Sequence, residues 1–395
     1  MVRGEEGAPA GARDSARGGW SVDGLTPARV ERPGSAEDLA GLLGEAVRAG
    51  EAVVPVGGGR ALGMGAPLKR WDLAIETSGL DRVLEYEPAD LTVTVEAGAS
   101  PEAVASTLAG AGQLLPLDPF ASPGHTVGGI LASGWSGPLR LGYRHPRDFL
   151  IGLRVALPDG SLVRSGGRVV KNVSGYDLNK LHLGALGSTG VIVEASFKVF
   201  TRPPSDLTLE TRAAAAAEAW DAAATALSAK APPVALELLS PHLDQGGPGE
   251  WRLLARLAGA RAPVERIAGE LGWPAAGAGV WEEHARRQDP AWARLSVPAR
   301  RLPEVTAELP HGSRWWASPG VGTAHWVGFD DPAEVASVRA ACEAAGGSLV
   351  LLAAPPELKQ AAGAFGRPPA TAGLMSKLRE AFDPTSAMGP GRFVC

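Results

Sequence analysis

Two glycine-rich segments carry the residue types and spacing best suited to chemistry in this sequence. The first is Gly57-Gly58-Gly59-Arg60, which directly follows the apolar run Ala52 to Val56, and the second runs from Pro123 to Gly134. Glycine has no Cβ, so a glycine-rich backbone can approach a ligand closely, and its consecutive N–H groups form a concave site for anions. The spacing therefore predicts a surface that holds a long, phosphate-bearing cofactor along main-chain amides. For the first segment alone, a simple glycine turn is the alternative.

The standard nucleotide and nucleophile motifs are absent from the sequence. No lysine follows a glycine, which excludes a Walker A loop, and no G-x-G-x-x-G opens a helix after a strand, which excludes the usual Rossmann fingerprint. Gly134-Trp135-Ser136-Gly137 has the wrong spacing for the nucleophile elbow of a hydrolase. A glycine-rich dinucleotide site without the Rossmann fingerprint points away from a nicotinamide cofactor.

The composition is that of a globular protein with room for two domains. The 395 residues are 45% apolar and 21% charged, and the net charge of -5 favours neither nucleic acid nor an anionic membrane as partner. Cys342 and Cys395 are too few for a disulfide framework or an iron-sulfur site, and they fit a reducing cytoplasm. The N-terminus has no apolar core of a signal peptide, so residues 1 to about 20 are expected to form a disordered tail. No apolar run is long enough to predict a membrane-spanning helix.

The elements that must position the glycine segments follow from capping residues and hydrophobic periodicity. Ser35 begins a helix that ends before Gly50, and Ser100-Pro101 opens another. Strands are predicted at 52–56, 72–76, 82–87, 91–96 and 191–200, and a boundary at 201–204. Beyond it, helices are expected at about 212–229, 262–271, 279–288, 332–345 and 374–382, and strands at 234–240, 251–258, 292–297, 314–317, 323–329 and 348–353.

At this point the chain resembles a known family. The motifs PVGGG, PGHTVGG, RDFLIG, LPDG, KNVSGYDL and GALGSTGVI are similar to the PCMH-type FAD-binding domain of vanillyl-alcohol oxidase and its relatives. Within that superfamily, GWSGPLR, SGGRVVKNVSGYDL, WARLSVP and FDPTSAMGPGRF most resemble the small FAD-binding subunit of bacterial glycolate oxidase. The resemblance is dense over about 30 to 205, patchy beyond, and resumes in the C-terminal tail.

The resemblance implies an α+β fold in three parts after the tail. A PCMH-type FAD-binding domain of two α+β subdomains is expected at 21–204, and an α+β cap with an antiparallel sheet covered by helices at 205–355. The remaining residues, 356–395, are expected to return towards the FAD domain.

The resemblance also implies which residues hold FAD. The pyrophosphate is expected near Val56 to Ala61 and the ribityl chain and flavin ring along Gly124 to Gly134. The adenosine half is expected near the backbone of Gly187, Gly190 and Ile192. Thr126 and Ser133 either donate hydroxyl groups or stabilise the turn, and Asp148 either faces the cofactor or pairs with Arg147 or Arg144. The full expected set is Val56, Gly57, Gly58, Gly59, Arg60, Ala61, Pro123, Gly124, His125, Thr126, Gly128, Gly129, Ala132, Ser133, Gly134, Asp148, Gly187, Gly190 and Ile192.

The sequence departs from relatives that attach the flavin through a histidine in the first loop. Gly59-Arg60-Ala61-Leu62 contains neither histidine nor cysteine, which predicts non-covalent FAD. The histidine-rich H-x-G-x-G-N-x-H-like segment of catalytic large subunits is also missing, which weakens the expectation that this chain oxidises glycolate alone. The second half has single histidines without metal-ligand spacing, so no metal site is expected; they are His242, His284, His311 and His325.

Two residues are candidates for catalysis, although no catalytic base is assigned. His125 lies in the second segment and either acts as a base or points away from the flavin. On a strand, Arg294 would share one face with Trp292 and Ser296, where it would bind a substrate carboxylate or simply lie exposed or in an interface.

Other polar and aromatic residues could have either a structural or a functional role. Trp315, Trp316 and Trp326 form an aromatic wall or ordinary core, and a subunit contact is a further alternative for some of the tryptophans. Lys171-Asn172 and Tyr176-Asp177 contact the cofactor domain or tie a loop to its own sheet.

These observations predict an FAD-dependent oxidoreductase that is a subunit of a complex oxidising glycolate or another small 2-hydroxy acid. The resemblance implies two partners, a larger flavin subunit and an iron-sulfur subunit, and a cytoplasmic location with any contact to the inner membrane made through them. A stand-alone FAD-dependent alcohol or 2-hydroxy-acid oxidoreductase is one alternative. A flavin-binding structural subunit without turnover is the other.

Overall fold

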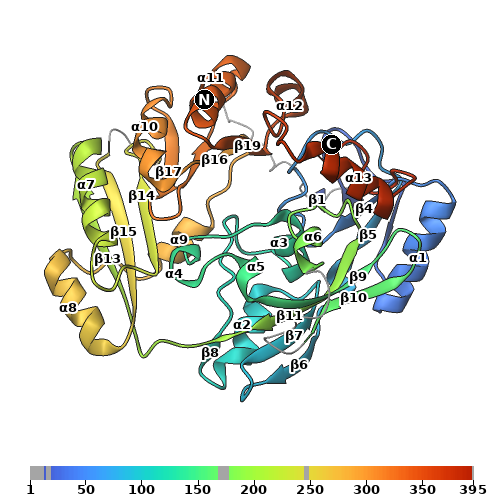
Figure 1. Cartoon of the computed structure of the whole chain (residues 1–395), viewed down its shortest axis with the longest axis horizontal. Helices are drawn as coiled ribbons and strands as arrows, with labels where there is room; N and C mark the ends of the chain where they lie inside the picture. Colours follow the sequence, from blue (N-terminus) through green and yellow to red (C-terminus); the bar gives the residue numbers. More distant parts are fainter. Residues whose placement is uncertain (1–12, 15–18, 168–177, 244–248, 394–395) are drawn as a thin grey trace, which may run out of the picture.

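The computed structural model describes residues 13–14, 19–167, 178–243 and 249–393. A region of two small sheets, formed mainly by the first 200 residues, lies beside a larger sheet formed by the second half of the chain (Figure 1). The final residues return to the first region, where the C-terminal segment lies near β4 (Figure 1). This arrangement confirms the α+β class that the sequence predicts.

The first small sheet is parallel and has the order β3-β5-β4. Its strands are β3 Arg29–Glu31, β4 Val53–Val56 and β5 Leu73–Glu76, and the helix α1, Ala36–Arg48, covers it. The Ser35 hydroxyl caps α1 by accepting a hydrogen bond from the Asp38 backbone N–H at 3.0 Å. Leu39 and Leu43 of α1 are fully buried against the sheet. This packing fixes the end of β4, from which the first glycine segment leaves.

The cap at Ser35 offers a test of this part of the fold. Ser35→Ala removes the side-chain acceptor, so we expect the free energy of unfolding to fall by about 1 kcal/mol. Ser35→Asp retains an acceptor and should unfold like the wild type. Urea denaturation of the three proteins measures the difference, and equal midpoints for Ser35→Ala and wild type would show that the cap contributes nothing.

The second small sheet is antiparallel and has the order β10-β9-β11-β7-β6. Its core is built from alternate residues such as Val93, Val95, Leu153 and Val155, against which the helix α3 packs. The elements are β6 Val83–Glu87, β7 Thr92–Glu96, β9 Leu150–Ala156, β10 Leu162–Gly166, β11 Val191–Lys198 and α3 Val127–Ser133. Shorter elements around it are η1 Thr77–Gly79, α2 Pro101–Ala109, β8 Gln113–Leu114, α4 Arg140–Tyr143, α5 Pro146–Phe149, α6 Asn179–His182 and β12 Phe200–Thr201.

The large sheet is antiparallel and has the order β13-β15-β14-β17-β18-β16-β19. Its strands are β13 Ser205–Ala213, β14 Ala235–Leu239, β15 Trp251–Gly259, β16 Trp292–Ser296, β17 Arg314–Ser318, β18 Thr323–Val327 and β19 Ser348–Ala353. Helices cover one of its faces (Figure 1): α7 Ala216–Leu227, α8 Arg261–Leu271, α10 Leu302–Ala307, α11 Pro332–Ala344 and α12 Pro356–Ala362. The remaining elements of this half are α9 Val280–Ala285, η2 Ala299–Arg301 and α13 Ala372–Phe382.

The structure corrects the predicted start of the second half. Residues 205–213 form the strand β13, and the helix that the sequence placed at about 212–229 begins only at Ala216. Leu209 and Ala213 are buried on β13 while Asp206 and Arg212 are exposed, which is the alternation of a half-buried strand. The alanine-rich segment that follows β13 obscured this boundary.

The tryptophans do not form one wall. Trp315 and Trp326 belong to the core between the large sheet and its helices, whereas Trp316 is buried on the opposite face, towards the cofactor side. Successive residues of a strand point to opposite faces, which explains why neighbouring tryptophans separate.

Both ends of the described chain contribute to the fold. Within the predicted N-terminal tail, most residues lie outside the described ranges, but β1 Arg13–Asp14 pairs with β2 Gly19–Trp20. Trp20 is buried and donates to the Glu76 carboxylate at 2.6 Å. At the other end, Met388 pairs with Val53 of β4, which brings the C-terminal segment beside the first glycine segment.

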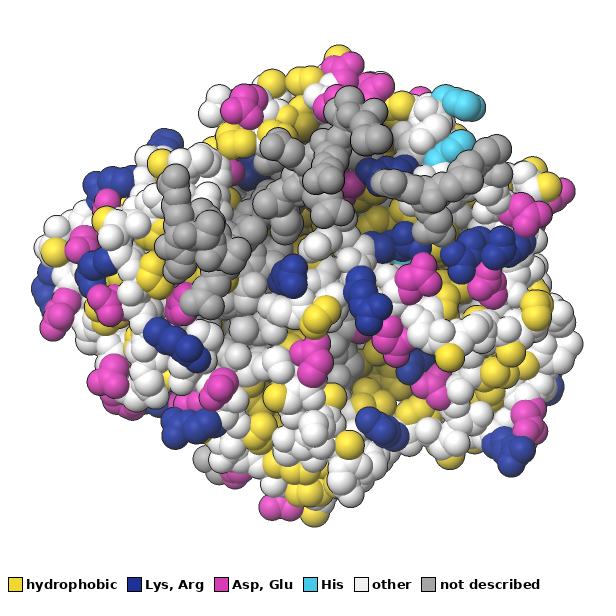
Figure 2. Space-filling model, turned by 180° about the vertical axis from the view of Figure 1, so that it is seen from behind, with side chains coloured by type: hydrophobic (Ala, Val, Ile, Leu, Met, Phe, Trp, Pro, Cys, Tyr) yellow, Lys and Arg dark blue, Asp and Glu magenta, His cyan; other side chains and the backbone are white. Residues whose placement is uncertain are grey.

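No helix in the described ranges is long and apolar enough to cross a membrane. Acidic and basic side chains are interspersed over the face drawn in Figure 2, without a continuous basic surface of the kind that nucleic acids require.

Candidate functional site

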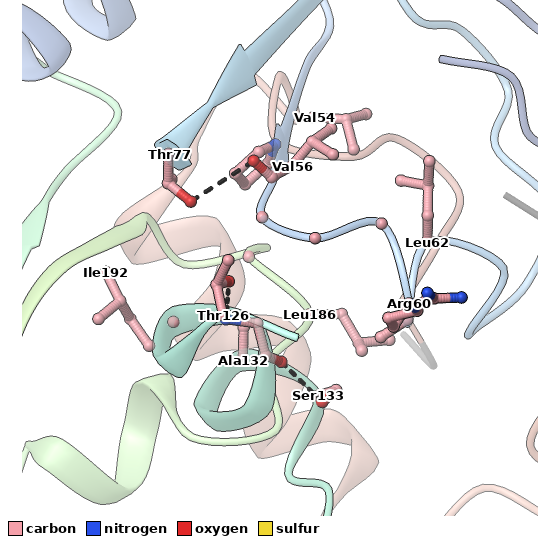
Figure 3. Close-up of a pocket in the computed structure, with 18 of the residues that line it drawn as sticks. Val54, Val56, Arg60, Leu62, Thr77, Thr126, Ala132, Ser133, Leu186 and Ile192 are labelled. Carbon is pink, nitrogen blue, oxygen red and sulfur yellow. Dashed lines mark hydrogen bonds between the residues drawn. The ribbon is translucent and has the colours of Figure 1, made fainter. Parts of the chain in front are cut away.

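An elongated pocket lies between the end of β4, the helix α3 and the loop before β11 (Figure 3). It encloses about 760 Å³ including its open mouth, and seven of its lining residues are glycines. Ile192 and Thr77 lie at one side of the view, Arg60 and Leu62 at the other, and Thr126 lies between them (Figure 3). A pocket of this length, lined mainly by backbone and apolar atoms, suits an extended dinucleotide.

The two glycine segments touch each other at the floor of this pocket. A Cβ on Gly57 would stand 2.1 Å from the Thr126 hydroxyl, and a Cβ on Gly58 would stand 1.6 Å from the Gly124 carbonyl oxygen. Both positions therefore require glycine for close packing, and the backbone of residues 57–59 stays open to the pocket. The two loops form one continuous cradle.

Most of the residues expected at the cofactor lie together around the pocket. Fifteen of the expected set line it, namely Val56, Gly57, Gly58, Gly59, Arg60, Ala61, His125, Thr126, Gly128, Gly129, Ala132, Ser133, Gly187, Gly190 and Ile192. Pro123 and Gly124 do not line it, and Gly124 instead supports Gly58 from behind. Gly134 lines a neighbouring hollow.

Asp148 was expected at the cofactor, but the structure gives it a different position. It is exposed and does not line the pocket. Its carboxylate accepts a hydrogen bond from the His145 backbone N–H at 3.1 Å and caps the helix α5. Among the described residues it forms no ion pair with Arg144 or Arg147, so neither expected role holds. The reason is local: a carboxylate three residues after the N-cap reaches back to the helix start.

Thr126 and Ser133 use their hydroxyl groups within the helix α3. Thr126 is the N-cap and accepts from the Gly129 backbone N–H at 3.2 Å, and Ser133 donates to the Gly129 carbonyl at 2.7 Å. Of the two roles considered from the sequence, the structure shows the local, stabilising one. The segment that the sequence presented as a loop is thus mainly a short helix between Thr126 and Gly134.

Several lining residues were not found by sequence reasoning. Val54 and Pro55 precede the first glycine segment, and Thr77 stands at the end of the adjacent strand, so their positions follow once the parallel pairing of β4 and β5 is known. Leu186 precedes the expected Gly187, and Arg392 lies in the C-terminal motif GPGRF, but neither side chain was assigned to the cofactor. The complete set of additional lining residues is Val54, Pro55, Leu62, Thr77, Leu186, Val191 and Arg392.

His125 lines the pocket but is held by the backbone. Its Nε2 donates to the Phe120 carbonyl oxygen at 2.7 Å, its ring packs against Trp135, and only 4% of the residue is exposed. Burial lowers its pKa to about 4, so the ring is neutral at pH 7. The structure gives His125 a clear packing role and keeps Nε2 occupied.

The low pKa of His125 makes stability depend on pH. The unfolded chain binds a proton at this residue near pH 6.5, whereas the folded chain binds it only near pH 4. The unfolded state therefore holds more protons between these values, and the free energy of unfolding should fall as the pH drops from 6.5 to 4, by on the order of 3 kcal/mol from this residue.

His125→Gln removes this titration and keeps a donor for the Phe120 carbonyl. Its stability should fall less than that of the wild type over the same pH range. Burial raises the pKa of Asp118 to about 7, which acts in the opposite direction, but this group is present in both proteins and cancels in the comparison. Urea midpoints at several pH values measure the two slopes, and parallel slopes would contradict the assignment.

A second hollow of about 810 Å³, again including its open mouth, lies at the C-terminal end of α3, where Ser133 lines the pocket and Gly134 lines the hollow. Arg294 of β16 lines it together with Ser296, while Ala293 and Leu295 point into the helix-covered core. This is the alternation that the sequence predicts for the strand. The polar face of β16 therefore opens onto a cavity rather than onto bulk solvent alone.

The hollow is strongly cationic. Arg140 lines it beside Arg294, together with His145, whose pKa is lowered by burial, and none of the described residues that line it is acidic. Burial, together with the charge of Arg140, lowers the pKa of Arg294 to about 10, which leaves it charged at pH 7. Two neighbouring guanidinium groups without a carboxylate form a site for a small anion, because a carboxylate can accept two parallel N–H bonds from each.

Aromatic side chains fill the space between the large sheet and the cofactor side. Phe120 and Trp316 are each 1% exposed, and Trp135 and Trp292 are each 3% exposed. The Phe120 ring contacts those of Trp292 and Trp316 at centroid distances of 6.3 and 5.2 Å. This apolar cluster excludes water next to the pocket and the cationic hollow.

The described residues contain no group of three or more acidic, histidine or cysteine side chains that could hold a metal ion. Lys171, Asn172, Tyr176 and Asp177 lie outside the described residues. The seven glycines of the pocket floor and the cationic residues Arg60 and Arg392 on its lining fit a flavin dinucleotide with its two phosphates.

Comparison with known proteins identifies the class of this site. Residues 27–166 match the family described as an FAD binding domain, and FAD is the cofactor. The solved structure of alkyldihydroxyacetonephosphate synthase matches 92% of this chain and 77% of its own with a TM-score of 0.67 and 17% sequence identity. This similarity shows that the two chains share a fold and confirms the predicted α+β class.

Three curated relatives share parts of the sequence. The chain is 39% identical over 128 residues to glycolate oxidase subunit GlcE of Escherichia coli, which is 32% of this chain and 37% of that protein. It is 34% identical over 191 residues to glycolate oxidase subunit GlcD of Bacillus subtilis, covering 47% and 40%, respectively. It is 33% identical over 178 residues to D-2-hydroxyglutarate dehydrogenase of Xanthomonas citri pv. viticola, covering 45% and 38%. The chain thus matches less than half of the length of each.

Proposed function

We propose that this protein is an FAD-dependent oxidoreductase of small 2-hydroxy acids and that it works as the FAD-binding subunit of a glycolate oxidase-type complex. The observation that carries the proposal is the cationic hollow around Arg294, which adjoins the cofactor pocket at Ser133 and Gly134. The relatives named as glycolate oxidase subunits and hydroxy-acid dehydrogenases support the same chemistry. The proposed domains are 21–204 for FAD, 205–355 for the cap and 356–395 for the returning tail.

Bound FAD would supply the acceptor for the hydride or electrons. Backbone N–H groups of residues 57–59 and the lining of the pocket would hold the dinucleotide without a covalent bond. Arg294, with Arg140 beside it, would bind the carboxylate of the hydroxy acid and fix its orientation. The aromatic cluster of Phe120, Trp135, Trp292 and Trp316 would keep water from the reacting atoms.

In this proposal a larger flavin subunit and an iron-sulfur subunit are the partners. The support is the similarity to proteins named as glycolate oxidase subunits. The described residues contain no cysteine cluster that could bind an iron-sulfur centre, so onward transfer of electrons would fall to a partner.

One observation favours a second candidate, a flavin-binding subunit without turnover. The face of the large sheet that looks towards the cofactor side is filled by buried aromatic rings, which leaves the hollow at Arg294 as a shallow site rather than a closed substrate cavity.

Anaerobic mixing separates the two candidates. The purified chain is mixed with glycolate, D-lactate or D-2-hydroxyglutarate, alone and together with subunits that co-purify with it, while the visible absorbance of the flavin is followed. Bleaching by a hydroxy acid supports the oxidoreductase. A flavin that stays oxidised in every mixture would leave only the structural role.

A further inference from the structure

The C-terminal segment carries a buried arginine that the proposed chemistry does not use. Arg392 is only 4% exposed and lines the cofactor pocket. Residues 54–62, which are far from it in the sequence, line the same pocket. The segment is held in place by backbone pairing, since the Gly389 N–H donates to the Val53 carbonyl at 2.9 Å and the Ala66 N–H to the Arg392 carbonyl at 3.0 Å. Its position is therefore fixed by the fold.

The hydrogen bonds of Arg392 use only part of its guanidinium group. Nη1 donates to the carbonyl oxygens of Leu62 and Met64, the latter at 2.8 Å. Nε and Nη2 find no hydrogen-bond acceptor among the described residues. Buried N–H groups are almost always satisfied in folded proteins, so unsatisfied Nε and Nη2 donors on a residue that lines a pocket indicate a binding partner in that pocket.

The positive charge of Arg392 is also not fully balanced by neighbouring carboxylates. The nearest carboxylate, Asp23, is 3.8 Å from Nη2 and already forms an ion pair at 2.7 Å with Lys359. All three side chains are at most 5% exposed. Two buried cations thus share one buried anion, which leaves an excess positive charge. Burying an uncompensated charge is costly, and an anionic ligand in the pocket would offset that cost.

The remaining lining of the pocket does not supply this anion. None of its described residues is acidic, and its only other cation is Arg60, which is partly exposed and donates to Gln288 at 3.2 Å. The pocket is therefore built for a ligand with negative charge at the end marked by Leu62 and Leu186.

We infer that Arg392 holds an anionic group of the bound FAD through its free Nε and Nη2 donors. FAD offers two such groups, the pyrophosphate and the pyrimidine edge of the flavin ring after reduction. This inference rests on cofactor binding alone and does not depend on the proposed substrate or partners.

The test compares reconstitution of apoprotein variants with FAD. Arg392→Met removes the charge, Arg392→Lys keeps it, and Arg367→Met makes the same charge change at an exposed arginine of the C-terminal region, whose side chain is 80% exposed. We expect the Kd for FAD, in the oxidised or in the reduced state, to rise at least tenfold in Arg392→Met, to recover partly in Arg392→Lys and to stay unchanged in Arg367→Met. The stabilisation against heat that FAD confers should shrink in parallel.

The midpoint potential of the bound flavin distinguishes the two anionic groups. If Arg392 holds the pyrophosphate, both oxidation states weaken equally and the potential stays constant. If it faces the reduced ring, only the reduced state weakens, and a tenfold selective loss lowers the two-electron potential by about 30 mV. Either result supports the inference.

Arg392→Gln replaces the methionine variant if that protein does not fold, because the amide can still donate to the Leu62 and Met64 carbonyls. The inference is overturned if a folded, uncharged variant binds FAD within threefold of the wild type at an unchanged potential. If the wild type binds FAD but none of the hydroxy acids bleaches the flavin, the proposed function fails and the inference about Arg392 stands.

Discussion

Replacing Gly58 by alanine is expected to remove most of the FAD-binding capacity of this protein, with a Kd at least tenfold higher than that of the wild type. The added Cβ would stand 1.6 Å from the Gly124 carbonyl oxygen and 2.7 Å from its carbonyl carbon. Both atoms belong to backbone, so no flexible side chain can move aside and the two loops must separate. Overpacking of this kind costs about 1 to 3 kcal/mol or more, and about 1.4 kcal/mol corresponds to a factor of ten in affinity.

Titration of the apoprotein with FAD measures this effect. Gly41→Ala is the matched control, because a Cβ at this position on α1 meets no other atom within 4 Å. Its affinity for FAD should equal that of the wild type, and its helix should be slightly more stable. Wild-type affinity in Gly58→Ala would show that the loops 57–59 and 123–126 do not form the cofactor cradle.

The second large effect is expected at Arg294. If its guanidinium binds the substrate carboxylate, Arg294→Met should lower kcat/KM for the hydroxy acid by about a hundredfold or more, which is the loss of about 2.7 kcal/mol expected for a charge-assisted bidentate bond. Affinity for FAD should not change, since Arg294 lines the hollow and not the cofactor pocket. Arg294→Lys keeps the charge without the planar fork and should recover only part of the activity.

The rate of anaerobic flavin bleaching is the direct measurement for these variants. Arg300→Met serves as control, because Arg300 is an exposed residue of η2 close to Arg294 in sequence. Equal bleaching rates for Arg294→Met and wild type, at equal flavin content, would exclude Arg294 from substrate binding.

Local sequence signals were sufficient for much of the fold. The Ser35 cap, the strand that ends at Val56 and the alternation around Arg294 depend on neighbouring residues only, and the structure has each of them. The glycine segments were also recognisable, since close backbone approach needs glycine whatever the partner. Asp148 shows the limit of the same approach: its position in a motif suggested a ligand, but a helix N-terminus three residues away takes its carboxylate.

Other features depend on how distant segments meet. Arg392 reaches the Leu62 carbonyl across 330 positions of the sequence, and neither residue carries a local signal of this contact. The strand β13 alternates in its own sequence, but its partner β15 begins only at Trp251, beyond the alanine-rich helix that hid the pattern. Charge balance at Asp23, Lys359 and Arg392 likewise becomes visible only when three separate segments are brought together.

The most direct test of the central claim is the flavin content of the purified chain before and after acid denaturation. Non-covalent FAD in the pocket predicts the two-band visible spectrum of an oxidised flavin, one FAD per chain, and complete release of the yellow colour into the supernatant when the protein is precipitated. A colourless protein that FAD cannot reconstitute would contradict the account, and a precipitate that stays yellow would contradict the non-covalent site.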